Sequence, residues 1–251
     1  MYLGNPFIIS NGFHPPVDIM AVKDALEAIK RGEIVLVFDF DDREGETDMT
    51  IASEFITPGH ITRMRKDAGG LLCTTTPFAA AKEIGLPFMS DVFWDGSGKY
   101  PLLAAMAPTD IPYDRTKSSF GVTINHRKTF TGITDRDRAL TITEYAETLF
   151  SGKPAEEIRR EMGERFRAPG HVHLLNTSER ILDGRKGHTE LCTALMIMAG
   201  VKPSATICEM MADDGNALKK DEAMEYAKEH GLVFVEGKDV VDAWAAWKKK
   251  G

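Results

Sequence analysis

The hydrophobic pattern along the chain alternates between the period of a helix and the period of a strand. Residues 17–31 carry apolar side chains at helical spacing, whereas residues 33–40 form a nearly continuous apolar run rich in β-formers. The same reasoning predicts further helices at 58–68, 76–85, 141–149, 155–166, 188–199, 221–229 and 239–248. It predicts further strands at 71–75, 120–126, 171–175, 204–210 and 232–235. Between residues 90 and 118, where Gly, Pro and Asp are frequent, we expect long surface loops.

Helices and strands interleave over the whole length, and no repeat or Pro/Gly/Ser-rich linker divides the sequence. This order is typical of an α/β (α+β) fold with one mixed, twisted β-sheet and helices packed on its faces. A chain of 251 residues is long enough to bury a large core without disulfides or metals. We therefore expect a single domain over residues 1–251.

Composition and charge exclude several classes of protein. With 43% hydrophobic and 27% charged residues, the composition is that of a soluble globular protein, and we see neither a membrane span nor a secretory signal. A net charge of −7 without a basic stripe argues against a nucleic-acid partner. The three cysteines are too few and too scattered for a disulfide framework. We expect a cytoplasmic protein with no nucleic-acid and no membrane partner.

The most unusual segment is the acidic stretch 39–48, which follows the strand at 33–40 and carries six carboxylates in ten residues. Only Arg43 offsets their mutual repulsion within the segment. Carboxylate oxygens are hard ligands, so a bound Mg²⁺ or Mn²⁺ would explain the crowding. The alternative is a solvated acidic turn.

A second segment, residues 185–190, reads Arg-Lys-Gly-His-Thr-Glu at the start of a predicted helix. The free N–H groups of a first helical turn attract anions, and Arg185, Lys186 and the Thr189 hydroxyl add donors, which favours phosphate binding. Gly187 gives the backbone freedom there, and a neutral His188 is able to ligate a metal. The alternative is a basic loop followed by a capping threonine.

Three further side chains are candidates for catalysis. His171 lies at the start of a predicted strand, and a histidine that titrates near neutrality is a natural proton shuttle. Glu209 follows a cysteine late in another strand, where an acidic group among apolar neighbours is either paired or has a raised pKa. Cys73 follows a glycine turn. The alternatives are a hydrogen-bonded core histidine, a solvent-facing glutamate and a thiol in core packing.

Taken in order, these segments resemble the 3,4-dihydroxy-2-butanone 4-phosphate synthases of riboflavin biosynthesis, over roughly residues 17 to 240. The matching pieces are DDREGETDM (41–49), GGLLC (69–73), SFGVTI (119–124), TGITDRDRALTI (131–142), APGHVHLL (168–175), GRKGHTE (184–190) and GVKPSATICEMMADDG (200–215). Bacterial members usually read RENEGD where this chain has Gly45 for Asn and Thr47 for Gly. The long 88–118 segment looks like archaeal or fungal variants.

The resemblance implies a role for each matching residue. Glu44 and His188 match the ligands of Mg²⁺ (or Mn²⁺), with one or two ions per site. Arg43 and Asp48 match residues that touch the sugar phosphate, and the segment from Arg185 to Thr189 matches the one that holds the phosphate group. Residues regarded as essential for turnover match His171 and Glu209, and two more pocket positions match Glu46 and Cys73.

The implied reaction converts ribulose 5-phosphate into 3,4-dihydroxy-2-butanone 4-phosphate and formate. It proceeds by metal-assisted enolisation, dehydration, skeletal rearrangement and loss of C4, without a redox cofactor. The family also implies a homodimer whose active sites contain residues from both chains. Since nothing in the sequence matches a fused GTP cyclohydrolase II domain, we expect a monofunctional lyase. The alternatives are another metal-dependent sugar-phosphate isomerase or aldolase, and a non-catalytic phosphate-binding protein.

Overall fold

A computed structural model of the chain describes residues 19–106 and 110–249. Its strands form one seven-stranded sheet in the order β4-β5-β3-β6-β2-β1-β7. The strands are β1 (Val35–Phe38), β2 (Thr47–Ala52), β3 (Cys73–Thr76), β4 (Phe120–His126), β5 (Phe166–Asn176), β6 (Ala205–Glu209) and β7 (Val233–Glu236). Because β1 pairs antiparallel with β2 but parallel with β7, the sheet is mixed. The predicted fold class is confirmed.

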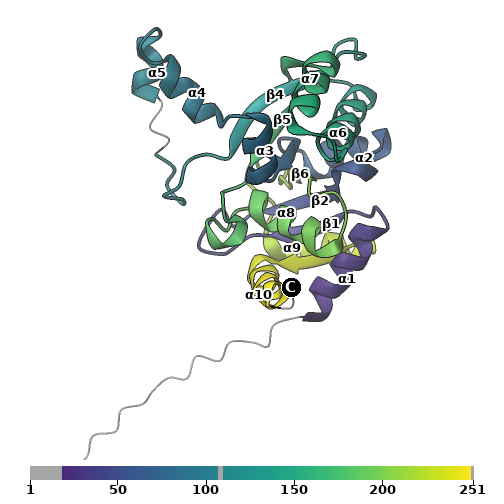
Figure 1. The fold of residues 1–251 in the computed structure, drawn as a ribbon. Helices are drawn as coiled ribbons and strands as arrows, with labels where there is room; N and C mark the ends of the chain where they lie inside the picture. Colours follow the sequence, from purple (N-terminus) through teal and green to yellow (C-terminus); the bar gives the residue numbers. More distant parts are fainter. Residues whose placement is uncertain (1–18, 107–109, 250–251) are drawn as a thin grey trace, which may run out of the picture.

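Helices cover both faces of this sheet (Figure 1). They are α1 (Ile19–Lys30), α2 (Pro58–Arg63), α3 (Phe78–Ile84), α4 (Met89–Gly96), α5 (Pro101–Met106), α6 (Asp135–Leu149), α7 (Ala155–Arg165), α8 (His188–Ala199), α9 (Lys220–Glu229) and α10 (Gly237–Lys248). Short turns of helix are η1 (Ser53–Phe55), the π-helical η2 (Met64–Ala68) and η3 (Ile181–Asp183).

Side chains on the two faces of the central strands pack into two separate hydrophobic cores. In β1, Leu36 packs into the core that holds residues of α6 and α9, whereas Val35 and Val37 pack into the core that holds residues of α1, α8 and α10. This alternation follows from the two-residue period of a strand. Burial on both faces explains why β1 reads as a continuous apolar run in the sequence.

The structure contains a central strand that the sequence pattern does not predict. β2 lies between β1 and β6, and all six of its residues are buried. Its sequence, Thr-Asp-Met-Thr-Ile-Ala, starts inside the acidic stretch and is half polar. Asp48 faces the pocket described below and Thr50 contacts Cys192 of α8, so the strand lacks the apolar run expected of a buried position.

Some predicted boundaries differ from the structure. The expectation of loops throughout residues 90–118 is wrong, because α4 and α5 lie within 89–106 and extend away from the sheet (Figure 1). Neither helix has a buried residue, so neither contributes to the two hydrophobic cores of the sheet. α6 begins at Asp135 because the Thr134 side chain caps it by accepting a hydrogen bond from the Asp137 N–H.

Other predicted elements overlap those of the structure. β5 extends beyond the predicted strand at both ends. The first predicted helix corresponds to α1, and its residues 17 and 18 lie outside the described residues. Within residues 19–106 and 110–249, no helix has the length and apolar character needed to cross a membrane.

Candidate active site

A cavity of about 270 Å³ opens on the α8 side of the sheet, where β2 begins, β6 ends and α8 starts. Residues from distant segments line it together. Nine of the twelve predicted site residues are among them: Arg43, Glu44, Glu46, Asp48, Cys73, Arg185, His188, Thr189 and Glu209. The fold therefore gathers the acidic stretch, the start of α8 and the end of β6 into one pocket.

Asp39, to which the sequence assigns no separate role, organises the acidic loop. Its buried carboxylate accepts hydrogen bonds from the backbone N–H groups of Glu44 (3.0 Å) and Glu46 (3.1 Å), and from Arg43 Nη1 (3.0 Å). The Asp39 N–H in turn donates to the Glu46 carbonyl. The loop is thus wrapped around one carboxylate, which directs the side chains of Glu44 and Glu46 into the pocket.

Gly45 explains how the loop tolerates its departure from the bacterial pattern. Its φ of 68° lies in the left-handed region, where Gly is unstrained and Asn is the best-tolerated substitute. A glycine in place of the bacterial asparagine is therefore compatible with this turn. Thr47, the second departure, is the first residue of β2 and is fully buried.

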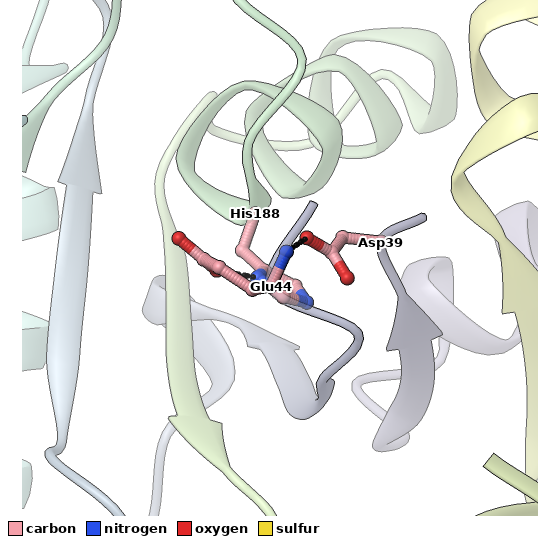
Figure 2. A group of neighbouring side chains, drawn as sticks. All are labelled: Asp39, Glu44 and His188. Atoms are coloured by element: carbon pink, nitrogen blue, oxygen red, sulfur yellow. Dashed lines mark hydrogen bonds and ion pairs between the residues drawn. The ribbon is translucent and has the colours of Figure 1, made fainter. Parts of the chain in front are cut away.

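The half-buried Glu44 and the buried His188 form a pair that joins the acidic loop to α8 (Figure 2). His188 Nδ1 lies 3.0 Å from Glu44 Oε2, and its Nε2 lies 3.2 Å from the Glu46 carbonyl oxygen. Although burial opposes the charged imidazole, the neighbouring carboxylates Asp48 and Glu44 outweigh it and raise the pKa of His188 to about 10. Burial also opposes the Glu44 carboxylate, but His188 and Arg43 lower its pKa to about 2.

At Asp48 and Glu46 the positive charge of His188 does not offset burial. Burial raises the pKa of Asp48 well above its usual value, and Glu209 and Glu44 add to the effect. Burial and the charge of Glu44 likewise raise the pKa of Glu46. Asp48 Oδ1 is buried without a hydrogen-bond partner in the described structure, at 3.7 Å from His188 Nε2. A cation would relieve this crowding.

The donor set fits a hard divalent ion. Ligand atoms of Asp39, Glu44 and His188 all lie within 4.8 Å of one another (Figure 2), and the nearby Asp48 oxygen is unsatisfied. Carboxylates with one imidazole suit Mg²⁺ or Mn²⁺. Since both Asp39 oxygens already accept hydrogen bonds that fold the loop, Glu44 and His188 are the freer ligands.

The start of α8 has the features of an anion site. Gly187 is its N-cap and supplies no capping side chain, which leaves first-turn N–H groups available. A Cβ built on Gly187 would lie 2.2 Å from Arg185 Nη1 and 2.8 Å from Arg43 Nη2. The absence of a side chain there lets both guanidinium groups approach the helix end.

Glu209 and Cys73 lie on neighbouring strands at the floor of the pocket. The Glu209 carboxylate accepts a hydrogen bond from the Leu71 N–H (2.6 Å), so it is held in the site rather than facing solvent. The Cys73 thiol is buried, and burial together with the negative charges of Glu209 and Asp48 raises its pKa well above the usual value. Cys73 is therefore a neutral thiol at pH 7.

Three predicted site residues do not line the pocket. Gly187 lies behind the two arginines, and the exposed Lys186 lines a second cleft next to it. His171 is exposed on β5, where its backbone N–H and its Nδ1 lie within hydrogen-bond distance of the Asn125 side chain (2.9 and 3.0 Å). It is neither a core histidine nor part of this pocket in the single chain.

Two residues next to the pocket arginines come from the segment that the sequence presents only as loop: Tyr113, which lines the pocket, and Asp114, which lines the neighbouring cleft. The Tyr113 ring lies 5.2 Å from Arg43 Cζ, a cation–π contact. Asp114 accepts hydrogen bonds from both Arg43 (3.2 Å) and Arg185 (2.7 Å). No sequence signal identifies them, because their partners lie about 70 positions away along the chain.

The chain is similar to known proteins over most of its length. A protein-family model described as 3,4-dihydroxy-2-butanone 4-phosphate synthase matches residues 23–243. The enzyme of that name from Methanothermobacter thermautotrophicus is 48% identical over 92% of this chain and 98% of its own length. The enzyme of that name from Candida albicans is 30% identical over 88% of this chain and 95% of its own length.

Solved structures of the same enzyme share the fold. One described as a cation-free form has a TM-score of 0.69 at 25% identity, covering 92% of this chain and 98% of its own. Another, described as a complex with two magnesium ions, has a TM-score of 0.67 at 26% identity, covering 87% and 93%. The resemblance found in the sequence motifs is confirmed. The chain belongs to the 3,4-dihydroxy-2-butanone 4-phosphate synthase family.

Proposed function

We propose that the pocket at the start of α8 converts ribulose 5-phosphate into 3,4-dihydroxy-2-butanone 4-phosphate and formate, as a lyase of riboflavin biosynthesis. The main support for this proposal is that the carboxylate–histidine pair, Glu44 and His188, lies directly beside the start of α8, which has the features of an anion site. A phosphorylated sugar reaches both when its phosphate lies at the helix end and its hydroxyl and carbonyl oxygens lie at the pair. Family membership supports this assignment over an isomerase or aldolase.

Glu44 and His188 would hold one or two divalent ions, Mg²⁺ or Mn²⁺. The unsatisfied Asp48 oxygen and the crowded carboxylates support a cation here, and a relative has been solved with two magnesium ions. A bound ion stabilises the negative charge that develops on sugar oxygens when a proton is removed next to the carbonyl. Asp39 then acts as a positioning residue, since it fixes the loop that carries Glu44.

The phosphate group would lie at the start of α8. Arg43 and Arg185 supply guanidinium groups, Thr189 supplies a hydroxyl, and Gly187 keeps the approach open. The exposed Lys186 adds positive charge from the neighbouring cleft. Asp48 would accept a hydrogen bond from a sugar hydroxyl, since its Oδ1 has no hydrogen-bond partner in the described structure.

Proton transfers would fall to the groups on the pocket floor and to one group from outside it. Glu209 and Glu46, which both line the pocket, would move protons between carbon and oxygen during enolisation, loss of the C1 hydroxyl and release of C4 as formate. Cys73, a neutral thiol, would shape the floor rather than attack the substrate. Because His171 is exposed and outside the pocket, we infer that it serves the site of a second copy in a homodimer.

A methyl group at Gly187 tests the phosphate position. Gly187→Ala is expected to raise the KM for ribulose 5-phosphate roughly tenfold, because the added Cβ displaces the Arg185 and Arg43 guanidinium groups. Both are ends of flexible side chains and the Gly187 φ of −91° suits alanine, so the melting temperature should stay the same. Gly163→Ala, where a Cβ meets nothing within 4 Å, is the matched control. An unchanged KM contradicts the placement of the phosphate.

Formate release tests the reaction itself. Purified protein is incubated with ribulose 5-phosphate and Mg²⁺, and again with EDTA. We expect formate with Mg²⁺ only, together with a product that lumazine synthase accepts. Substrate loss without formate would indicate the isomerase or aldolase alternative, and no turnover with Mg²⁺ or Mn²⁺ would leave a sugar-phosphate binder.

We propose further that the chain is a single domain over residues 1–251 and works in the cytoplasm. One continuous sheet joins the described segments, which supports the single domain. All three cysteines, Cys73, Cys192 and Cys208, are buried free thiols, as is usual in a reducing compartment.

A further inference from the structure

The carboxylate of Asp114 lies between Arg43 and Arg185, two arginines that line the pocket. One oxygen, Oδ2, accepts hydrogen bonds from Arg43 Nη2 (3.2 Å) and from Arg185 Nε (2.7 Å). The other, Oδ1, accepts from the backbone N–H of Thr116 (2.9 Å) and from its hydroxyl (2.7 Å). Only 9% of the Asp114 side chain is exposed. This is the way in which a small anion is held by a guanidinium pair.

Both arginines are already paired with carboxylates, which leaves few of their N–H groups for a phosphate. Arg43 pairs with Asp39, Glu44 and Asp114, while Arg185 pairs with Asp114 and Glu190. Four carboxylates therefore surround two guanidinium groups. A phosphate brought against the two arginines would meet these four carboxylates and find the N–H groups that face Asp114 already engaged.

Asp114 differs from the other three carboxylates in how it is anchored. Asp39 is held by backbone N–H groups inside the loop, Glu44 is paired with His188, and Glu190 is fully buried on α8 and accepts from the Ser178 N–H. Asp114 belongs to a surface segment whose neighbours Tyr113, Arg115 and Thr116 are exposed. It is thus the carboxylate that is able to leave without unfolding a helix or strand.

The position of Asp114 also separates two cavities. Arg43, Tyr113 and Arg185 line both the main pocket and a second cleft of about 350 Å³, and Asp114 lines that second cleft. Withdrawal of the Asp114 side chain would open the space between the arginines toward the start of α8. Burial opposes the Asp114 carboxylate, but Thr116 and the two arginines lower its pKa to about 2, so it stays ionised at neutral pH.

We propose that Asp114 is an internal anion: its carboxylate occupies the phosphate position between Arg43 and Arg185, and a phosphorylated ligand must displace it to bind. This inference rests on the proposed function, which places the substrate phosphate at these two arginines. Asp114 keeps the guanidinium groups in place in the empty site and lowers the affinity of the site for phosphate, which makes it an autoinhibitory contact. The segment 110–118 therefore changes position when the site fills.

Phosphate binding without turnover tests the proposal. The dissociation constant of inorganic phosphate is measured by calorimetry in MgCl₂ for the wild-type protein and for Asp114→Asn. The neutral amide keeps the shape of the side chain but loses the charge-assisted hydrogen bonds, so Asp114→Asn should bind phosphate about tenfold more tightly. Unchanged, weaker or undetectable phosphate binding in Asp114→Asn overturns the proposal, because Asp114 would then be a permanent support of the arginines.

Two further variants localise the effect. Asp135 is a matched control, since its carboxylate also bridges two arginines and accepts from a threonine, but its arginines, Arg65 and Arg138, are not among the residues that line the pocket. Asp135→Asn should leave phosphate affinity unchanged. In a protein that also carries Arg185→Gln, Asp114→Asn should no longer increase the affinity for phosphate. An increase that persists in this double variant also overturns the proposal. Because none of these measurements needs formate release, failure of the proposed reaction is detected separately.

Discussion

His171→Ala and Glu209→Gln are each expected to lower the rate of formate release by about 10²–10⁴-fold, the usual contribution of one acid–base group. When the two inactive proteins are mixed and allowed to exchange subunits, activity should return. The reason is the location of the two side chains. Glu209 lines the pocket of its own chain, whereas His171 is exposed on β5 and outside that pocket.

The recovered activity has an expected size. In a mixed homodimer with shared sites, one site receives both defects and the other receives neither. Random exchange at equal concentrations therefore restores about a quarter of the wild-type sites. The measurement is formate release as a function of the mixing ratio, with the dimer verified by its mass in solution.

Controls separate this result from a loss of folding. Each variant should keep the wild-type circular dichroism spectrum. His230→Ala is a matched histidine control, since His230 stacks on Tyr226 at the end of α9 and is not among the residues that line the pocket. It should keep full activity. If the mixture stays inactive while mixed dimers form, His171 acts within its own chain and the shared site is wrong.

Glu44→Gln is expected to lower turnover by about 10³-fold or more, because a metal ion that stabilises developing charge contributes several kcal/mol. The amide keeps the size of the side chain but removes a charged ligand next to His188. Calorimetric titration with Mg²⁺ should show weaker binding in the same variant. Asp42→Asn removes an exposed carboxylate of the same loop and should leave Mg²⁺ affinity unchanged.

The pH dependence of metal binding follows from the same pair. In the metal-free protein His188 carries a proton below a pH of about 10, because its carboxylate neighbours stabilise the imidazolium. A metal ligand must be a neutral imidazole, so binding releases that proton and the affinity for Mg²⁺ should rise by up to about tenfold per pH unit from neutrality toward pH 10. Calorimetry in buffers of different ionisation enthalpy counts the protons. Binding without proton release would remove His188 from the set of ligands.

The sequence by itself determined the chemistry and most of the secondary structure. The acidic stretch, the glycine and histidine at the start of α8 and the glutamate at the end of β6 are recognisable because each is local: its meaning depends on residues within a few positions. The alternation of helices and strands is local in the same sense, because hydrophobic periodicity is read within one element.

Only the tertiary structure decided the roles that depend on distant partners. β2 is a central strand because β1 and β6 flank it, although its own sequence is half polar. Asp39 and Asp114 are both ordinary acidic residues in the sequence, yet one organises the loop and the other bridges two arginines.

For His171, the sequence identifies the residue but does not tell in which pocket it lies. Its motif marks it for catalysis, but its exposure on β5 indicates that it is not placed in the pocket of its own chain. The physical reason is common to these cases. Hydrogen bonds and burial depend on which segments meet in space, and a pattern within one segment carries no information about the charge or shape of the segment it will meet.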